Sequence, residues 1–292
     1  MRWRFAGGTM REYSCVTEPR SQPAGPTRWV VTLPPAVFLL AFFLAPALIV
    51  VLASIREPGE FGGLAPLPAL SADAYAFLFG DVIYLEIFVR SFLVALLTTL
   101  ICILLAYPLA WLIARSPKQR RDLLVLLVIL PFASNFLVRV YAWIMLLGPA
   151  NLLYTPYAVI AGLVYVHLPF MILPLYTNLE KHDPALLEAA QDLGANAWTR
   201  FWRVTFPLSL PGIFSGSALV FIPVLGMFAV PELLGGTGDI LIGNLIKEQF
   251  LDNRDWPLGS ALSIMLTVAV LALAGLMAWA ARRGLHGTEA VT

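Results

Sequence analysis

Few residues of this chain have the types and the spacing that catalysis or metal binding requires. The three histidines, His167, His182 and His286, have no partner at the spacing of a metal-binding pair. The two cysteines, Cys15 and Cys102, form no Cys-x-x-Cys site. The sequence also lacks the His-Glu-x-x-His helix of zinc proteases and the Gly-x-Ser-x-Gly turn of serine hydrolases. We therefore expect no catalytic residue and no metal site. An intramembrane enzyme is the alternative class that these absences disfavour.

A glycine-rich segment, Gly235-Gly236-Thr237-Gly238, comes nearest to a phosphate-binding loop. It is not followed by the Lys-Ser/Thr pair that reaches the phosphates and the magnesium ion in such loops. We interpret it as a turn between two elements. The chain is therefore expected to hold no cofactor, and energy from ATP and magnesium would have to come through another polypeptide.

Two arginines, Arg90 and Arg139, lie inside long apolar runs. A charge at the centre of a bilayer costs at least about 2.5–3.5 kcal/mol on insertion scales, so each needs a partner or water. Arg90 follows Glu86 by four residues and lies near the end of its run, so pairing with Glu86 and extension toward the interface would suffice. Arg139 lies deeper. It either bonds to carbonyl groups or a carboxylate within the protein, or it lines a solute pathway.

Composition indicates which elements carry these residues. Hydrophobic residues make up 59% of the 292 residues, charged residues make up 13%, and the mean hydropathy is +0.80. A water-soluble protein of this size could not cover its surface with so few charges. Apolar runs of about 20 residues can cross a bilayer as helices. Such runs occur at Trp29–Ile55, Ile87–Ala114, Leu123–Leu147, Tyr157–Tyr176, Leu210–Pro231 and Leu258–Ala281. We predict an all-α, polytopic membrane protein with six transmembrane helices.

The positions of Lys and Arg predict the orientation, because loops rich in these residues stay in the cytoplasm. Most bases lie in the two terminal segments and in alternate connections: Arg2, Arg4, Arg11, Arg20, Arg28, Arg115, Lys118, Arg120, Arg121, Lys181, Arg200, Arg203, Arg282 and Arg283. The other connections hold only Arg56, Lys247 and Arg254. We predict a disordered cytoplasmic tail at residues 1–28, a six-span domain at 29–282 with a cytoplasmic loop at 177–209, and a cytoplasmic tail at 283–292.

The connections on the opposite side are acidic. They hold Glu57, Glu60, Asp73, Asp81, Glu86, Glu232, Asp239, Glu248, Asp252 and Asp255. A negative mouth would attract a cationic solute, and the rings of Tyr141, Trp143 and Trp256 could bind an ammonium group. Glu232 and Asp255 are therefore candidates for contact with a solute or a partner. The alternative is that acids collect where bases are excluded and that the aromatic residues form an interfacial belt.

The predicted cytoplasmic loop at 177–209 has the punctuation of two short helices. Asp183 followed by Pro184 is typical of a helix start, and Gly194 stands where a glycine would end that helix. Asn196 can cap a second helix, Ala197 to Thr205, which we expect Pro207 to stop. A compact elbow of this kind indicates a docking surface, although a solvated amphipathic linker would show the same composition.

The same loop resembles the EAA signature of permease subunits of ATP-binding-cassette importers. Its spacing is kept in full, with Val and Phe where Ile and Leu are usual. The matching residues are Glu188, Ala189, Ala190, Gly194, Val204, Phe206 and Pro207. In that family the loop is a pair of coupling helices that inserts into a groove on the ATPase subunit. The resemblance implies that Glu188 contacts the ATPase and that Gly194 forms the elbow.

Three further segments, at residues 137–143, 168–176 and 253–257, are similar to the permeases of spermidine/putrescine importers. The resemblance covers roughly residues 85–282. It departs at Met227, where an acidic residue is expected in the polyamine permeases. The missing carboxylate weakens the case for a polycationic solute and keeps another small solute as the alternative.

The resemblance implies the type I importer permease fold in a bacterial inner membrane. It also implies several partners, namely ABC ATPase subunits at the cytoplasmic loop, a second permease subunit that is a different chain, a periplasmic solute-binding protein and membrane lipid. It implies no nucleic acid. The expected function is translocation of a small solute, with a polyamine as the first candidate. The residues expected along the pathway are Glu232, Asp255, Trp256, Arg139, Tyr141, Trp143 and Met227.

Overall fold

A computed structural model describes residues 26–66 and 69–289, and almost all of the predicted N-terminal tail lies outside these residues. The described residues form helices, joined by turns and two isolated β-bridges. The α-helices are α1 (Pro26–Ser54), α2 (Asp73–Gly80), α3 (Val82–Arg115), α4 (Lys118–Ile129), α5 (Phe136–Leu147), α6 (Pro156–Leu179), α7 (Pro184–Asp192), α8 (Ala197–Arg200), α9 (Phe206–Gly226), α10 (Ala229–Leu234), α11 (Ile242–Leu251) and α12 (Trp256–Glu289). A 3₁₀ turn, η1 (Leu130–Ala133), and a π turn, η2 (Phe201–Thr205), complete the described elements.

The chain divides into two units, Met1–Leu48 and Ile49–Thr292, with the boundary inside α1. Among the residues that the structure describes, five helical segments are long and apolar enough to cross a membrane, and a bent pair of helices raises the number to six if it counts as one span. The five segments are Leu33–Ser54, Val82–Arg115, Pro156–Leu179, Ala197–Gly226 and Trp256–Leu276. They correspond to the predicted spans other than the third. The all-α class and the membrane-spanning character are therefore confirmed.

The third predicted span, Leu123–Leu147, is not one helix. α4 and η1 are followed by α5 after a bend of 92°. Pro131 lacks an N–H group, and its ring would clash with the carbonyl four residues earlier, so the chain tightens into η1. Asn135 then starts α5, because its side-chain oxygen accepts a hydrogen bond from the Leu137 N–H at 2.8 Å. Hydrophobicity alone could not show this break, since both halves are apolar.

The fifth span also differs from the prediction at both ends. Pro207 does not stop the helix that starts at Ala197, because η2 connects α8 to α9 without interruption. In η2 the Phe206 N–H bonds to the Phe201 carbonyl, five residues back, and a π turn of this kind lets a helix continue past an irregular position. The helix ends at Gly226 rather than Pro231, because Met227 is extended. Pro231 lies in the separate short helix α10.

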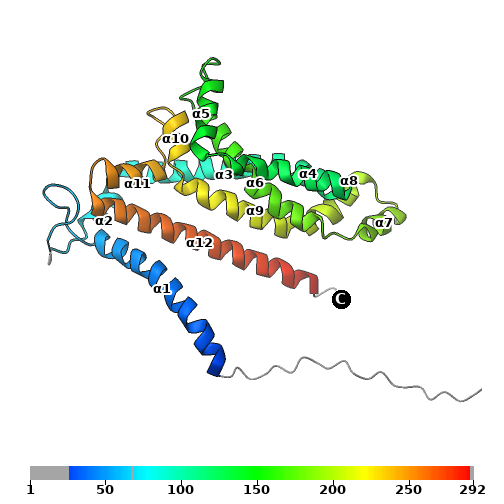
Figure 1. Cartoon of the computed structure of the whole chain (residues 1–292), viewed down its shortest axis with the longest axis horizontal. Helices are drawn as coiled ribbons and strands as arrows, with labels where there is room; N and C mark the ends of the chain where they lie inside the picture. The colour runs from blue at the N-terminus through cyan, green and yellow to red at the C-terminus, as the bar shows by residue number, and fades with distance from the viewer. Residues whose placement is uncertain (1–25, 67–68, 290–292) are drawn as a thin grey trace, which may run out of the picture. The chain divides into compact units, whose positions relative to one another are not determined.

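The core of the second unit lies between α3, α6 and α9, which run side by side (Figure 1). Small residues bring these helices close together, as expected where lipid rather than water surrounds a bundle. A Cβ added to Gly216 of α9 would lie 2.6 Å from the Met171 sulfur of α6, and one added to Gly212 would lie 2.8 Å from the Asn178 Cβ. Buried Leu163, Met171 and Leu175 fill the rest of the α6 face.

The three core helices set the positions of two smaller groups of elements. α7 and α8 lie at one end of the core, and α2 and α11 lie toward the other (Figure 1). α11 packs against α12, and α10 packs against α5 and α6. The backbone of α12 continues to Glu289, so residues 283–289 of the predicted C-terminal tail are helical.

Candidate functional site

The first candidate site is the helix pair, which we define as α7, α8 and the elbow between them. α7 begins as the sequence predicts, because Asp183 accepts a hydrogen bond from the Ala185 N–H at 2.9 Å. It ends at Asp192, and Gly194, two residues later, has a φ of +80°. The Ala195 N–H bonds to the Ala190 carbonyl at 3.0 Å and the Gly194 N–H to the Gln191 carbonyl at 2.9 Å, which is the Schellman pattern. A left-handed φ strains most residues that carry a side chain, asparagine least among them, so glycine suits the elbow best.

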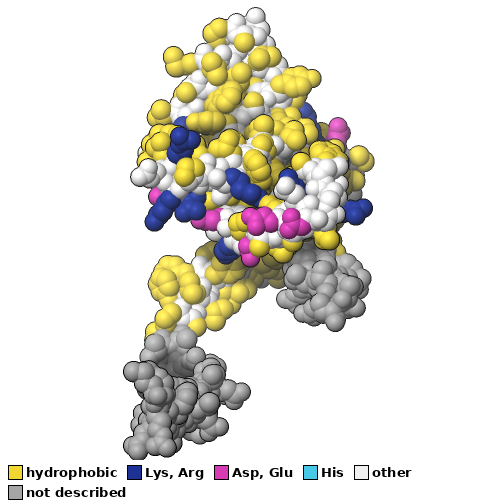
Figure 2. Space-filling view, turned by 90° about the vertical axis from the view of Figure 1, so that its right-hand side faces the viewer, with side chains coloured by type: hydrophobic (Ala, Val, Ile, Leu, Met, Phe, Trp, Pro, Cys, Tyr) yellow, Lys and Arg dark blue, Asp and Glu magenta, His cyan; other side chains and the backbone are white. Residues whose placement is uncertain are grey.

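α8 is fixed to α7 by short-range contacts. Asn196 accepts a hydrogen bond from the Thr199 N–H at 2.8 Å, and Arg200 Nη1 donates to Gln191 Oε1 at 2.7 Å. Glu188, Ala189 and Gly194 are exposed, whereas Ala190 is half-buried. Figure 2 looks onto this end of the second unit, where acidic side chains form a row among basic ones. The helix pair is therefore a rigid, charged protrusion.

Two residues of the same motif that follow the elbow, Val204 and Phe206, face the bundle instead. Val204 and Phe206 are half-buried, and the Phe206 ring lies 5.0 Å from the Trp202 ring and 6.4 Å from the Tyr107 ring of α3. Pro207 is exposed at the start of α9. This half of the motif connects the helix pair to the core helix α9 through the uninterrupted turn η2.

A groove of about 450 Å³ separates the helix pair from the end of α3. Its lining residues are Trp111, Arg115, Pro184, Leu187, Glu188, Ala197, Arg200, Phe201 and Thr205. The Arg115 guanidinium lies 5.6 Å from the centre of the Trp111 ring. The lining combines two aromatic side chains with two arginines, residue types that are enriched at protein–protein interfaces.

The second candidate site, which we call the acidic hollow, lies around α10, α11 and the loop between them. It has a volume of about 430 Å³. It is lined by Pro231, Glu232, Gly235, Gly236, Thr237, Asp239, Ile240, Asn244, Lys247, Glu248 and Asp252. Lys247 Nζ lies 2.8 Å from Glu232 Oε1 and 3.6 Å from Asp252 Oδ2. The hydrogen bond to Glu232 is the main cause that raises the pKa of Lys247.

The carboxylates that line the acidic hollow outnumber its single lysine. Even with Glu232 paired to Lys247 and Asp239 paired to Arg90, the acidic hollow keeps a net negative charge, which favours binding of an ammonium group. Glu232 and Asp252 have side chains that are 43% and 59% exposed, so water and salt screen this charge in part. The acidic hollow can therefore attract and exchange a cation rather than trap it.

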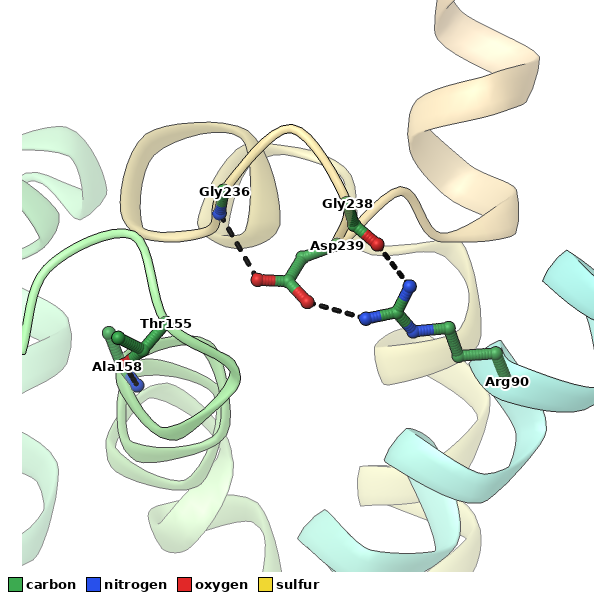
Figure 3. A network of polar contacts seen from close by, with 6 residues as sticks. All are labelled: Arg90, Thr155, Ala158, Gly236, Gly238 and Asp239. Atoms are coloured by element: carbon green, nitrogen blue, oxygen red, sulfur yellow. Dashed lines mark hydrogen bonds and ion pairs between the residues drawn. The ribbon is translucent and has the colours of Figure 1, made fainter.

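Arg90 pairs differently from the prediction. Its partner is Asp239, not Glu86 (Figure 3). Arg90 Nη2 lies 2.5 Å from Asp239 Oδ1, and Nη1 donates to the Gly238 carbonyl. The local spacing of four residues favoured Glu86, but a loop brought in by the fold offers both a carboxylate and a carbonyl to the planar guanidinium.

Comparisons with known proteins agree with this architecture. The family described as "Binding-protein-dependent transport system inner membrane component" matches residues 76–283. The chain is 42% identical over 268 residues to the spermidine/putrescine transport system permease protein PotB of Salmonella typhimurium, covering 85% of this chain and 91% of the relative. It is 45% identical over 223 residues to PotB of Escherichia coli K12, covering 70% of this chain and 81% of the relative.

The chain belongs to this family of inner membrane permeases. In fold, the permease is similar to a chain of a bacterial alginate ABC transporter solved with an alginate-bound periplasmic protein, with a TM-score of 0.70. That match has 17% identity and covers 87% of the permease and 93% of the other chain. The family and the fold make this chain a transport subunit, and they replace the alternative of an intramembrane enzyme.

Of the seven predicted pathway residues, only Glu232 lines the acidic hollow. Asp255 lines a separate hollow of about 200 Å³, and its Oδ1 accepts a hydrogen bond from the Leu258 N–H at 3.1 Å, which caps α12. Trp256, the first residue of α12, is 46% exposed. Met227 is partly buried and forms the extended link between α9 and α10.

The predicted pathway residues of α5 lie apart from the acidic hollow. The Arg139 guanidinium lies 5.9 Å and 6.0 Å from the centres of the Phe132 and Phe136 rings. Within the described part of the chain, its buried Nε has no hydrogen-bond partner. Aromatic rings therefore take the place of the expected carbonyl groups or carboxylate. Trp143 packs edge-on against Tyr165 with 5.6 Å between ring centres, and Tyr141 is 54% exposed.

Lys247 and Asp239 are parts of the acidic hollow that the sequence does not predict as site residues. A single lysine among several acidic residues is a signal for an ion pair, and this signal could have indicated Lys247. Asp239 directly follows the glycine-rich turn, but its partner lies 149 residues earlier. Nothing in the spacing of the permease sequence indicates that pair.

Proposed function

We propose that the permease is a membrane-spanning subunit of an ATP-driven importer for a polyamine such as spermidine or putrescine. The acidic hollow supports this proposal, because it offers several carboxylates to a polycation. The relatives that share 42–45% identity with the chain are named as spermidine/putrescine permeases. Met227 stands where the resemblance leads us to expect a carboxylate, and Glu232, five residues later on the neighbouring helix, supplies one in this proposal.

The helix pair docks on the ATPase subunit in this proposal. Glu188 and the exposed Ala189 form the contact, and the Schellman turn at Gly194 sets the angle between α7 and α8. ATP and magnesium bind the ATPase, whose closure moves the helix pair. Because η2 continues α8 into α9, the movement reaches the core without a flexible joint.

The orientation follows from the charges at the two ends. The end with the helix pair carries Arg115, Arg121 and Arg200, so it faces the cytoplasm, and both termini lie on that side. The acidic hollow then faces the periplasm, where a solute-binding protein delivers the solute. A second permease subunit, which is a different chain, completes the pathway through the inner membrane.

Reconstitution tests the proposed function. The permease would be purified with its partner permease, ATPase and binding protein and placed in proteoliposomes. We expect spermidine or putrescine to stimulate ATP hydrolysis and to accumulate inside, whereas an uncharged sugar does neither. A complex that another small solute stimulates and that polyamines do not would contradict the polyamine proposal and support the alternative substrate. ATP-independent turnover by the permease alone would contradict the transporter proposal.

A further inference from the structure

The second half of the loop between α10 and α11, residues 235–241, is held by one core helix, α3. Arg90 of α3 donates to the Gly238 carbonyl and pairs with Asp239 (Figure 3). The next residue of α3, Ser91, is 2% exposed, and its Oγ accepts a hydrogen bond from the Ile242 N–H at 2.8 Å. Two consecutive residues of α3 therefore fix the end of the loop and the start of α11.

Asp239 is a structural carboxylate rather than a free ligand. Its Oδ1 faces Arg90, and its Oδ2 accepts a hydrogen bond from the Gly236 N–H at 3.1 Å. Its side chain is 12% exposed. Both oxygens are thus occupied within the protein, so the charge available to a cation in the acidic hollow comes from the other carboxylates.

The opposite side of the loop packs against the connection between α5 and α6. The Tyr154 N–H bonds to the Leu234 carbonyl at 2.9 Å. A Cβ on Gly236 would lie 2.9 Å from the Tyr154 carbonyl oxygen, and one on Gly235 would lie 2.9 Å from Val159 Cγ2. Thr155, the residue after Tyr154, caps α6 by accepting a hydrogen bond from the Ala158 N–H at 3.3 Å (Figure 3). The loop is therefore clamped between two elements and has little freedom to adjust.

We propose that Arg90 is a positioning residue that acts as a latch between α3 and the acidic hollow. The clamped loop sets the spacing of α10 and α11, and with it the distance between Glu232 and Lys247. Because α3 belongs to the core, a shift of this helix must either carry the loop along or break the Arg90–Asp239 pair. The state of the core is in this way transmitted to the carboxylates that receive the solute.

The first test measures the latch without any solute. Hydrogen exchange would be followed by mass spectrometry on the assembled transporter in lipid nanodiscs. We expect Arg90→Gln and Asp239→Asn each to speed exchange of the amides in residues 236–242 about tenfold. The double variant should be no faster than either single variant, because both remove the same contact. Arg90→Lys should be intermediate, since a lysine can keep the ion pair but cannot bridge both acceptors.

Glu86→Gln is the matched control, because Glu86 lies one turn before Arg90 on the same helix and is the partner that local spacing favours. We expect its exchange pattern to equal that of the wild type. Unchanged exchange in Arg90→Gln, or an equal increase in Glu86→Gln, would overturn the latch.

The second test rests on the proposed function and uses spermidine as the probe. In proteoliposomes, Arg90→Gln and Asp239→Asn should raise the half-saturating concentration of the spermidine-loaded binding protein about fivefold or more, with a smaller change in maximal rate. An unchanged half-saturating concentration together with faster exchange would overturn the positioning role. A wild-type complex that does not transport spermidine would contradict the proposed function, and the exchange measurement would still decide the latch.

Discussion

α7 and α8 of the helix pair and α11, which lines the acidic hollow, lie toward opposite ends of the second unit (Figure 1). The two sites differ in the sequence range of the contacts that hold each of them. In the helix pair, the side-chain hydrogen bonds join residues two, three or nine positions apart. In the acidic hollow, the Arg90–Asp239 pair spans 149 residues and the bond between Ile242 and Ser91 spans 151. The helix pair is therefore held by local contacts, whereas the acidic hollow combines local ion pairs with two long-range contacts from α3.

The difference fits what each site does in the proposed mechanism. A docking surface must keep its shape while it is pushed, and short-range caps and turns provide that stiffness whatever the state of the core. A solute site must change with the core, and long-range contacts make it responsive. Substitutions at the two sites should accordingly fail in different ways.

The largest effect is expected at the elbow of the helix pair. Gly194→Val places a β-branched residue at a φ of +80°, which costs roughly 1–2 kcal/mol or more and unwinds the Schellman turn. We expect uptake per ATP hydrolysed to fall about tenfold or more, with the permease still assembled in the membrane. Gly194→Asn is the control, because asparagine tolerates a left-handed φ and should keep most of the coupling. Equal loss in both variants would show that the backbone conformation is not what matters.

A smaller effect is expected at the ion pair of the acidic hollow. Lys247→Gln makes the acidic hollow more negative and Glu232→Gln makes it less negative, so the two should change the half-saturating spermidine concentration in opposite directions, each by about two- to fivefold. Uptake titrations at low and high salt provide the measurement, and high salt should reduce both effects. Shifts in the same direction would contradict an electrostatic role.

The Lys247–Glu232 pair predicts that the effect of Lys247→Gln on uptake does not depend on pH near neutrality. Glu232 raises the pKa of Lys247, so the pair is intact below the ordinary lysine pKa and is lost only as pH rises through the raised value. The ratio of wild-type to Lys247→Gln uptake should therefore stay constant between about pH 7 and pH 9. A ratio that changes steeply in this window would assign the titration to another group.

The smallest effect is expected at the cap of α7. Asp183→Ala removes the hydrogen bond to the Ala185 N–H and should cost about 1 kcal/mol of local helix stability. We expect amide exchange at the start of α7 to increase about fivefold and uptake to fall no more than about twofold. Asp183→Asn keeps an acceptor oxygen and should exchange like the wild type. Faster exchange around Asp239 in Asp183→Ala would show that the two sites are not independent.

Most of the fold could be predicted from the sequence, because runs of apolar residues long enough for a bilayer leave few other structures. The errors fall where two principles compete. The apolar run Leu123–Leu147 predicts one helix, but the helix is interrupted at Pro131. Local rules predict a helix end at Pro207, but the π turn at Phe201–Thr205 lets the helix continue beyond it. Both errors concern how a helix deals with a proline, and neighbouring elements decide that.

The candidate sites were predicted unequally for the same reason. Asp183, Gly194 and Asn196 act on residues within a few positions, so their types and spacing sufficed to place α7, the elbow and α8. Glu232 was found because it follows an apolar run, but Lys247 and Asp239 were not, since their roles depend on partners outside their own helix.

By itself, the sequence determined that this protein is a bundle of membrane-spanning helices with a stiff, protruding helix pair. Apolar length, charge asymmetry and the glycine at the elbow are properties of neighbouring residues, and they hold before any packing occurs. Only the tertiary structure decided that Arg90 pairs with Asp239 rather than with Glu86 on its own helix. The guanidinium lies on α3 beside a loop that packing brings to it, and no local rule contains the distance between two segments 149 residues apart.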